Sequence, residues 1–266
     1  MKKKIIALAL CLALIAGIVC LFAGCGDKQE TIVVGYTIYK PMNYTEDGEL
    51  VGFDTELAKA VFEGLGYKVV FKEIKWENKY TELEAGNIDC IWNGFTANVP
   101  DDDGVQRSEK VDFSYNYMEN FQAVVVTKDS TIATLDDLNG LVGIAENGSA
   151  GQTYAESLKG VTFKGYTKQT DCLLEINAGG AADFAVVDVQ LARSYVGKGD
   201  YSNLKIVDGL SSDAEYYAIG FKKGSDLTAK VNEQLEKLAK DGTIMKIAEK
   251  YDVAETVITD FSDQKK

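Results

Sequence analysis

Short apolar segments of strand length alternate with segments of helical periodicity along most of the chain. Strands are predicted at residues 31–36, 67–74 and 88–92, and helices at 54–65 and 76–85 between them. This alternation of strand and helix is typical of α/β architecture.

A second round of the same alternation follows. Its strands are predicted at 122–127, 141–145, 161–165 and 183–187. Helices are predicted to begin at Ser149 and Thr170. In both rounds a helix ends at glycine, and the apolar strand after it begins at an aspartate, Asp89 or Asp183. We therefore expect two similar lobes.

A strand at 216–222 and two helices at 227–240 and 244–251 come last, and the apolar stripes of these helices indicate packing on a core.

Composition narrows the range of functions. The chain of 266 residues has a formal net charge of −13 and contains no histidine. The absence of histidine excludes histidine-ligated zinc and haem sites and any nucleophile activated by an imidazole. An acidic chain repels nucleic-acid phosphates and anionic lipid headgroups, and no glycine-rich phosphate loop is present. We expect no nucleic-acid partner, no metal and no cofactor.

The N-terminus predicts the compartment. Three lysines precede an uninterrupted apolar run over residues 5–23. The run leads into Leu21-Phe22-Ala23-Gly24-Cys25, which resembles a bacterial lipobox, in which cleavage before the cysteine leaves it acylated, for example with palmitate. We interpret 1–24 as a lipoprotein signal peptide, Cys25 as the lipidated residue and 25–30 as a linker. The alternative is a plain transmembrane helix, and both interpretations place the body outside the cytoplasm.

Only two cysteines, Cys90 and Cys172, belong to the body of the protein. An oxidising compartment would allow a disulfide between them. Because Cys90 is in an apolar strand and Cys172 in an apolar helix, we expect two buried thiols instead.

Six segments follow one another in an order that carries a family resemblance. They are 48–60, 83–89, 107–114, 135–144, Asp188 and 217–224, and the first contains Gly52-Phe53-Asp54. Together they are similar to the family 3 solute-binding proteins of amino-acid ABC importers and span nearly the whole mature chain. Each segment alone is weak evidence, whereas the ordered set is specific.

The resemblance implies an α/β fold of the two-lobed periplasmic-binding-protein type (type II, Venus-flytrap) with two crossing hinge strands. We assign the crossing to the predicted strands 122–127 and 216–222. Lobe 1 is then discontinuous and comprises residues 31–121 and 223–266, and lobe 2 comprises residues 122–222.

A free amino acid is a zwitterion, so its site needs a cation and N–H donors for the carboxylate, and an anion and acceptors for the ammonium. Arg107 suits the carboxylate because its planar guanidinium matches two oxygens, and it precedes Asp112 as in the family. The alternative is a solvated arginine in the polar loop 98–108, which is longer than usual. Ser149 offers a hydroxyl and N–H groups at a helix N-terminus, and alternatively caps that helix.

The resemblance assigns the ligand ammonium to Asp188, which alternatively caps the next helix. Asn93, Gly94 and Thr96 follow the strand at 88–92, and open α/β sheets bind ligands at the carboxyl ends of their strands. The resemblance gives Gly94 a backbone acceptor for the ammonium and Thr96 donors for the carboxylate.

Three aromatic residues are candidate walls for the ligand side chain. The family alignment supports Trp76, whereas core packing is the alternative for Phe95 and Tyr39. Asp54 belongs to the family motif and is interpreted as a helix cap outside the site.

Family members that take basic amino acids often carry an acid shortly after the first strand, and here none precedes Lys40. Neutral polar amino acids or cystine are therefore favoured over basic ones, and Lys40 leaves acidic ones open.

We therefore predict a lipid-anchored monomer on the outer face of the cell membrane, extracellular or periplasmic. It captures a free amino acid between its lobes and delivers it to an ABC permease without catalysis. One alternative is a ligand-binding sensor or co-receptor of the same fold. Another is an enzyme similar to cyclohexadienyl dehydratase, in which Glu146 or Glu215 would transfer the proton. In the sequence, neither glutamate differs from a solvated one.

Overall fold

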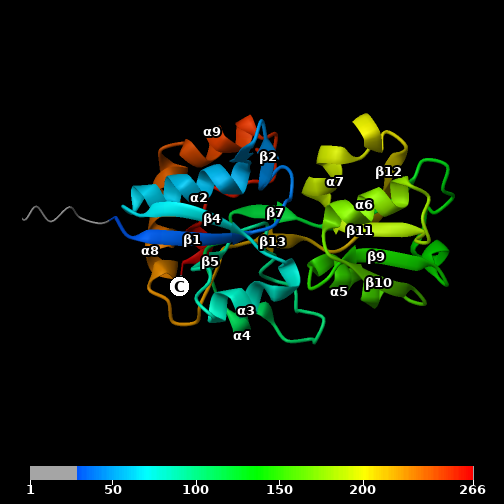
Figure 1. Ribbon diagram of the computed structural model, residues 1–266, viewed down its shortest axis with the longest axis horizontal. Coiled ribbons are helices and arrows are strands. Elements are labelled where there is room, and N and C mark those ends of the chain that lie inside the picture. The colour runs from blue at the N-terminus through cyan, green and yellow to red at the C-terminus, as the bar shows by residue number, and fades with distance from the viewer. Residues whose placement is uncertain (1–28, 266) are drawn as a thin grey trace, which may run out of the picture. The chain divides into compact units, whose positions relative to one another are not determined.

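The computed structural model describes residues 29–265, of which the residues from Thr31 onward form one compact unit. This unit contains two groups of strands and helices, one at each side of Figure 1. The predicted signal peptide 1–24 and the lipidated Cys25 lie outside the described residues. Within the described part of the chain, no helix has the length and apolar character needed to cross a bilayer.

Lobe 1 is built on a five-stranded sheet. Its strands, in spatial order, are β4 (Lys68–Glu73), β1 (Thr31–Tyr36), β5 (Cys90–Ile91), β14 (Gly220–Phe221) and β6 (Asp112–Phe113). β1 pairs in parallel with β4 and β5, and β14 pairs antiparallel with β5 and β6. The first three strands are the ones predicted from the apolar segments, although β5 is shorter than expected.

Helices cover lobe 1, and a small hairpin completes it. These elements are α2 (Phe53–Gly64), η1 (Trp76–Asn78), α3 (Lys79–Glu84), α4 (Arg107–Lys110), α8 (Leu227–Lys240), α9 (Thr243–Lys250), η4 (Ser262–Gln264) and the hairpin of β2 (Tyr44–Glu46) and β3 (Glu49–Val51). The C-terminal helices α8 and α9 pack against α2, and Figure 1 shows them beside it in orange and red. The last part of the chain therefore returns to lobe 1.

Lobe 2 has a five-stranded sheet of its own. Its strands, in spatial order, are β10 (Thr162–Tyr166), β9 (Val142–Glu146), β11 (Phe184–Asp188), β8 (Gln122–Thr127) and β12 (Leu204–Ser211). Its helical elements are η2 (Leu135–Leu138), α5 (Ala150–Ser157), α6 (Gln169–Asn177), α7 (Val189–Tyr195) and η3 (Gly199–Tyr201). The apolar pattern did not reveal β12, whose residues alternate in burial only irregularly.

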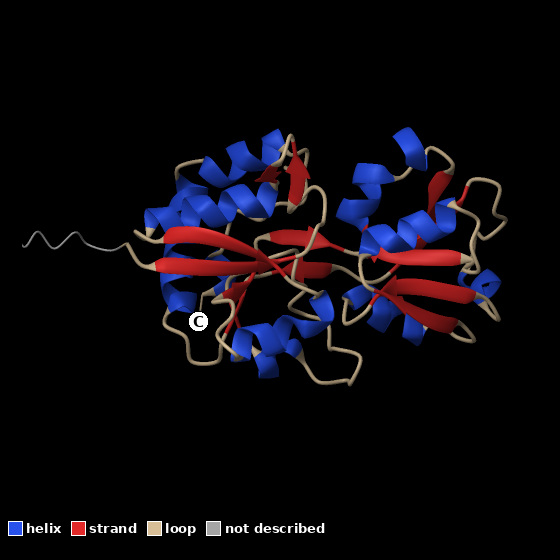
Figure 2. Ribbon diagram, in the orientation of Figure 1, coloured by secondary structure: helices blue, strands red, loops and turns tan. Residues whose placement is uncertain are grey.

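Two short strands connect the lobes. β7 (Met118–Asn120) and β13 (Glu215–Tyr217) pair antiparallel, and Figure 2 shows them between the two groups of red strands. The sequence analysis assigned the crossing to 122–127 and 216–222, and this assignment was wrong in detail. β8 belongs to the sheet of lobe 2, and the second predicted strand is divided between β13 and β14, which belongs to the sheet of lobe 1.

The two rounds of the sequence have the same local geometry. The Asp89 carboxylate accepts the backbone N–H of Val33 at 2.7 Å, and the Asp183 carboxylate accepts that of Val142 at 2.7 Å. In each lobe an aspartate before one strand therefore satisfies an N–H of the neighbouring parallel strand.

The two body cysteines have separate environments. Cys90 and Cys172 are both buried free thiols, in β5 and α6 respectively. This agrees with the expectation that each packs as a small apolar side chain in its own lobe.

Candidate ligand-binding site

A small cavity lies between elements of the two lobes. Lobe 1 contributes η1, the segment after β5 and the start of α4, and lobe 2 contributes the ends of β9 and β11 and the starts of α5 and α6. The lining residues are Trp76, Asn93, Gly94, Thr96, Arg107, Glu146, Ser149, Ala150, Gln169 and Asp188. The cavity leaves about 10 Å³ for the centre of a water molecule, which is room for about one water. The two lobes are therefore closed around it.

The position of the cavity follows from the fold. β5, β9 and β11 run parallel to their neighbours β1, β10 and β9, and the cavity lies where these three strands end. In open α/β sheets the carboxyl ends of the strands and the starts of the following helices leave polar backbone groups for a ligand. The sequence argument placed Asn93, Gly94 and Thr96 here for the same reason.

Arg107 is buried in the cavity wall, with 1% of its surface exposed. Its Nε donates to Asp101 Oδ1 at 2.9 Å, and its Nη1 donates to the carbonyl oxygen of Thr96 at 3.0 Å. Its Nη2 is buried and has no hydrogen-bond partner among the described residues. The alternative of a solvated loop arginine is wrong. The guanidinium is held at two nitrogens, and the third remains unpaired beside the cavity.

The long loop before Arg107 has a structural role that sequence reasoning missed. Asp101 belongs to it and is 4% exposed, and its carboxylate also accepts from Lys110 Nζ at 2.9 Å and from the Tyr80 hydroxyl at 2.7 Å. Burial alone would raise the pKa of Asp101, but Arg107 and its other partners hold it below its ordinary value. The extra residues therefore bring a counter-charge to the arginine.

Gly94 lies on the cavity in a conformation that requires glycine. Its φ is +56°, and a Cβ at this position would lie 2.7 Å from Cε1 of Tyr39. Its N–H donates to Asp54 Oδ2 at 2.8 Å. The interpretation of Asp54 as a helix cap was wrong: α2 begins after Gly52, and Asp54 also accepts from the Tyr117 hydroxyl at 3.0 Å. Burial raises the pKa of Asp54 to about 7.

Asn93 and Thr96 are fixed by lobe 1 and the crossing strands. The Asn93 amide donates to the carbonyl oxygen of Thr37 at 3.0 Å and to Asn43 Oδ1 at 2.7 Å, and its Oδ1 accepts from the Thr37 hydroxyl. The Thr96 hydroxyl donates to Glu215 Oε2 at 3.1 Å. Asn93 therefore positions the segment that carries Gly94.

Ser149 is the N-cap of α5 and also lines the cavity. Its Oγ accepts the backbone N–H of Gln152 at 3.1 Å, which is the capping bond. The two roles that the sequence analysis left open are therefore compatible, because the residue that caps the helix is also at the cavity wall.

Asp188 is the centre of a buried hydrogen-bond network. Its Oδ1 accepts from Asn120 Nδ2 at 2.6 Å and from Gln122 Nε2 at 2.7 Å, and its Oδ2 accepts from Gln169 Nε2. Asp188 stands at the N-cap position of α7, but its side chain makes no capping bond there, so that alternative is wrong. Burial raises its pKa. The network fixes the carboxylate beside the cavity.

Three acidic or amide residues of the site were not predicted as ligand-binding residues, and Glu146 and Glu215 were considered only as proton-transfer groups of the enzyme alternative. Glu146 and Gln169 line the cavity, and Glu215 accepts from the same Asn120 and Gln122 amides as Asp188. Glu146 is 3% exposed and Glu215 2% exposed, so the expectation that they resemble solvated glutamates was wrong. Burial and then the charge of Asp188 raise the pKa of Glu146 to about 8 and that of Glu215 to about 7.

One feature of the sequence could have indicated Glu146 as a site residue, namely its place at the end of a strand just before a helix. Glu146 ends β9 just before the start of α5, as Asp188 ends β11 just before α7. Gln169 is the first residue of α6, for which we expected Thr170 as the cap; the N-cap is Lys168.

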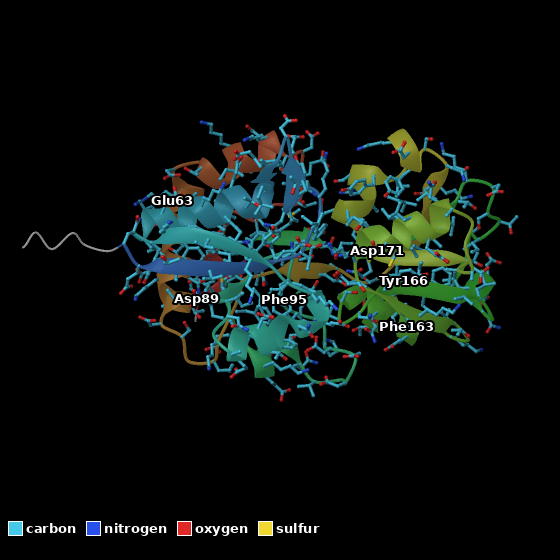
Figure 3. The ribbon with its side chains drawn as sticks, viewed as in Figure 1. Glu63, Asp89, Phe95, Phe163, Tyr166 and Asp171 are labelled. Carbon is cyan, nitrogen blue, oxygen red and sulfur yellow. The ribbon has the colours of Figure 1, made fainter. Side chains whose placement is uncertain are left out.

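Two of the predicted aromatic walls are in the core and do not line the cavity. The Phe95 ring, labelled in Figure 3, packs 5.3 Å from that of Trp76 and 4.9 Å from that of Phe113. The Tyr39 hydroxyl is 2.6 Å from the Tyr217 hydroxyl, and the ring lies behind Gly94. Of the three, only Trp76 lines the cavity. Core packing was the correct alternative for Phe95 and Tyr39.

Several contacts hold the lobes in the closed arrangement. Lys79 Nζ donates to the carbonyl oxygen of Gly148 at 2.9 Å, and Lys168 forms an ion pair with Glu73 at 2.8 Å. Lys79 is almost fully buried, and burial followed by the nearby charge of Arg107 lowers its pKa to about 7. These contacts join residues of lobe 1 to residues of lobe 2 around the cavity.

Comparison with known proteins agrees with this geometry. Residues 32–254 match the model for bacterial extracellular solute-binding proteins, family 3. The chain belongs to this family.

Relatives of known name differ in their ligands. The chain is 27% identical over 233 residues to the arginine-binding extracellular protein ArtP of Bacillus subtilis (strain 168), covering 86% of this chain and 89% of ArtP. It is 29% identical over 230 residues to the L-cystine-binding protein TcyJ of Escherichia coli (strain K12), covering 84% and 83%.

A solved structure of similar fold extends the comparison. The ancestral amino acid-binding protein AncCDT-1, described as a precursor of cyclohexadienyl dehydratase, has a TM-score of 0.73 and 30% identity to this chain. The match covers 83% of this chain and 95% of that protein. Proteins similar to this chain are therefore named for different ligands, and a ligand has to be argued from the site itself.

Proposed function

We propose that this protein is the substrate-binding component of an amino-acid ABC importer. It captures a free amino acid between its two lobes and delivers it to a membrane permease. The observation that carries the proposal is the unpaired Nη2 of buried Arg107, in the same cavity wall as the anchored carboxylate of Asp188. A cation and an anion in one small cavity match the two charged ends of an α-amino acid.

Each end of a zwitterion finds a complementary group. The Arg107 guanidinium would receive the ligand carboxylate, together with donors from Thr96 and from Ser149 at the start of α5. The Asp188 carboxylate would receive the ammonium, with the Gly94 carbonyl as a further acceptor and Trp76 as a wall. Both charges are removed from water, so each requires such a partner.

The small volume of the cavity implies a cycle of opening and closing. A cavity with room for about one water cannot admit an amino acid while the lobes keep this arrangement. Rotation at the crossing strands β7 and β13 would separate the two walls, and ligand contacts to both lobes would favour closure. A permease that prefers the closed form would then receive only loaded protein.

The lipid anchor is also part of the proposal. Cleavage before Cys25 and acylation of that cysteine would hold a monomer on the outer face of the cell membrane, close to its permease. Replacement of Cys25 by serine is expected to release the protein from the membrane fraction. Retention of the Cys25→Ser protein in membranes would instead support the transmembrane alternative.

A dehydratase of the same fold is the second candidate function. The observation that favours it is the burial of Glu146 and Glu215, two carboxyls with raised pKa values that could transfer a proton. A site for binding alone explains the same residues as charge partners for a ligand. Incubation with arogenate and prephenate separates the two: unchanged substrate supports a binding protein, and turnover supports an enzyme.

The melting temperature in the presence of ligands tests the main proposal. Purified protein, freed of carried-over ligand by unfolding and refolding, is heated with each common L-amino acid, with cystine and with arogenate. A ligand at a hundred times its Kd adds about 2.7 kcal/mol to the free energy of unfolding. A shift with one or a few amino acids is the expected result. The absence of any shift would overturn the proposal and direct attention to other solutes or to a sensor role.

A further inference from the structure

Acidic groups outnumber cationic groups in and directly behind the cavity. Glu146 and Asp188 line it, and Glu215 shares its amide donors with Asp188. The cation of the wall, Arg107, is already paired with Asp101 at 2.9 Å. A neutral amino acid brings one positive and one negative charge, so it would leave this acidic surplus unchanged.

Among the described residues, Glu146 differs from the other acids of the site because its carboxyl has no hydrogen-bond partner. Asp188 accepts three side-chain amides, and Glu215 accepts the Thr96 hydroxyl as well as two amides. No hydrogen bond from another described residue reaches the Glu146 carboxyl, although it is 3% exposed. Such a group leaves its hydrogen-bonding capacity for something that enters the cavity.

The nearby lysines do not supply this partner. Lys79 Nζ donates to the Gly148 carbonyl oxygen, and Lys168 Nζ pairs with Glu73 at 2.8 Å. Burial is the main reason that the pKa of Glu146 is raised to about 8, and the charge of Asp188 adds to it. A second positive charge in the cavity would offset both effects.

We propose that Glu146 is the residue that selects the ligand side chain, and that the transported amino acids are those with a cationic side chain. The inference rests on the proposed function, since it presumes that Arg107 and Asp188 hold the α-carboxylate and α-ammonium. Glu146 then pairs with the guanidinium or ammonium at the far end of the ligand, and Trp76 covers its aliphatic part. The sequence argument for neutral ligands considered only the segment after the first strand, whereas this acid comes from β9 of lobe 2.

The competing arrangement is a protonated Glu146 that donates its O–H to a polar neutral ligand. The two arrangements differ in what they require of residue 146. A cationic ligand needs the negative charge, which glutamine cannot supply. A neutral polar ligand needs only a donor of the same shape, which glutamine does supply.

Paired cationic and neutral ligands with the same aliphatic chain test the proposal on the unmodified protein. L-Arginine is compared with L-citrulline, which lacks its charge, and L-lysine with L-norleucine, by calorimetric titration of refolded protein. At least one cationic amino acid is expected to bind at least 30-fold more tightly than its neutral analogue, because a buried charge pair usually has an effect of this size. A 30-fold difference in affinity corresponds to about 2 kcal/mol. Equal binding within both pairs, or a preference for the neutral members, would overturn the inference.

The Glu146→Gln variant extends the test, with Glu63→Gln as its control. Glu63 is an exposed acid near the C-terminal end of α2, labelled in Figure 3, and it does not line the cavity. Its replacement therefore changes the net charge equally without touching the cavity. Glu146→Gln is expected to weaken binding of the cationic ligand about 30-fold or more, and Glu63→Gln less than twofold. Unchanged affinity in Glu146→Gln would contradict the assignment.

The outcomes separate this inference from the proposed function. If neutral amino acids bind and cationic ones do not, the importer proposal stands and the role of Glu146 is refuted. If no amino acid binds the wild-type protein, both fail together. Should Glu146→Gln not fold, the comparison of arginine with citrulline on the wild-type protein still decides.

Discussion

Arg107 illustrates how single residues make this site. Its guanidinium is fixed by Asp101 and by the Thr96 carbonyl, so little side-chain freedom remains to be lost when a carboxylate reaches Nη2. The same fixation makes the residue hard to replace, because Asp101 would lose its buried partner.

Replacement of Arg107 is therefore expected to weaken binding of the amino acid strongly. Arg107→Lys retains the charge but lacks the planar fork, and should weaken amino-acid binding about 30-fold, since a hydrogen bond to a charged group contributes about 1.5–3 kcal/mol. Calorimetric titration measures the loss. Arg193→Ala, at an exposed arginine of α7, is the control and should bind normally. Normal affinity in Arg107→Lys would refute its role as the carboxylate clamp.

A glycine pair tests the backbone of the site. Gly94 and Gly86 both have positive φ, but a Cβ at Gly94 would lie 2.7 Å from Tyr39, whereas one at Gly86 has nothing within 4 Å. Gly86→Ala should lower the free energy of unfolding by about 1 kcal/mol through backbone strain alone. Gly94→Ala should lower it by about 3 kcal/mol, because the clash adds to the strain. Urea unfolding measures both, and equal losses would show that the clash is relieved.

The individual residues also show what sequence alone could reach. Arg107, Asp188, Gly94, Thr96, Asn93, Ser149 and Trp76 were predicted from motif positions and strand ends, and all of them line the cavity. Glu146 was considered only as an acid of the enzyme alternative, because its place at a strand end before a helix does not by itself show that its side chain faces a cavity. Phe95 was misplaced because it lies between two residues of the cavity wall, Gly94 and Thr96, and its own side chain packs in the core. Tyr39 was misplaced because its ring lies behind Gly94 and not in the wall.

At the scale of the elements, the ends of strands and helices decide how the cavity is built. Predicted strands and helices agreed with the structure where apolar runs were long, as in β1, β8 and α8. The crossing was misplaced because β7 and β13 have three residues each, and their buried positions include the polar residues Asn120 and Glu215. Similarly, Asp54 resembled a cap because it opens a helical pattern, but a buried Gly94 N–H competes for its carboxylate.

Asp54 predicts a pH dependence of stability. Its pKa is about 7 in the folded protein and 3.8 for the free side chain, so folding favours the protonated form. This contribution is fully present below about pH 3.8 and is lost as the pH rises to about 7. Each pKa unit corresponds to about 1.4 kcal/mol. In Asp54→Asn, the free energy of unfolding should therefore fall less between pH 4 and pH 7.5 than in wild type, as measured by urea unfolding. An equal or steeper fall would contradict the assignment.

The contacts between the lobes predict an effect on closure. Lys79→Met removes the bond to the Gly148 carbonyl, and the closed form should lose about 1.4 kcal/mol, or a factor of ten in ligand affinity. Lys168→Met breaks an exposed ion pair with Glu73 and should change affinity less than twofold. Small-angle scattering of the ligand-free proteins should show a larger radius of gyration for Lys79→Met. Identical affinity in the two variants would indicate that Lys79 does not stabilise closure.

At the scale of the whole molecule, two similar lobes present opposite charges to one cavity. Lobe 1 contributes the cation Arg107, and lobe 2 contributes the anions Glu146 and Asp188. A ligand that carries both charges would therefore bond to both lobes, and only closure would bring both walls to it. The resemblance of scattered motifs was sufficient to predict this plan, because each motif is located at the end of a strand or the start of a helix that the fold brings together.

Native mass spectrometry of the refolded protein tests the central claim most directly. The protein is incubated with an equimolar mixture of the common L-amino acids and cystine, and the mass of the bound species is read from the complex. We predict one amino acid per chain, displaced in competition by an excess of the same amino acid carrying a heavy-isotope label and much reduced in Arg107→Lys. A chain that carries no amino acid from the mixture, or one that Arg107→Lys binds equally well, would contradict capture of a zwitterion between the lobes.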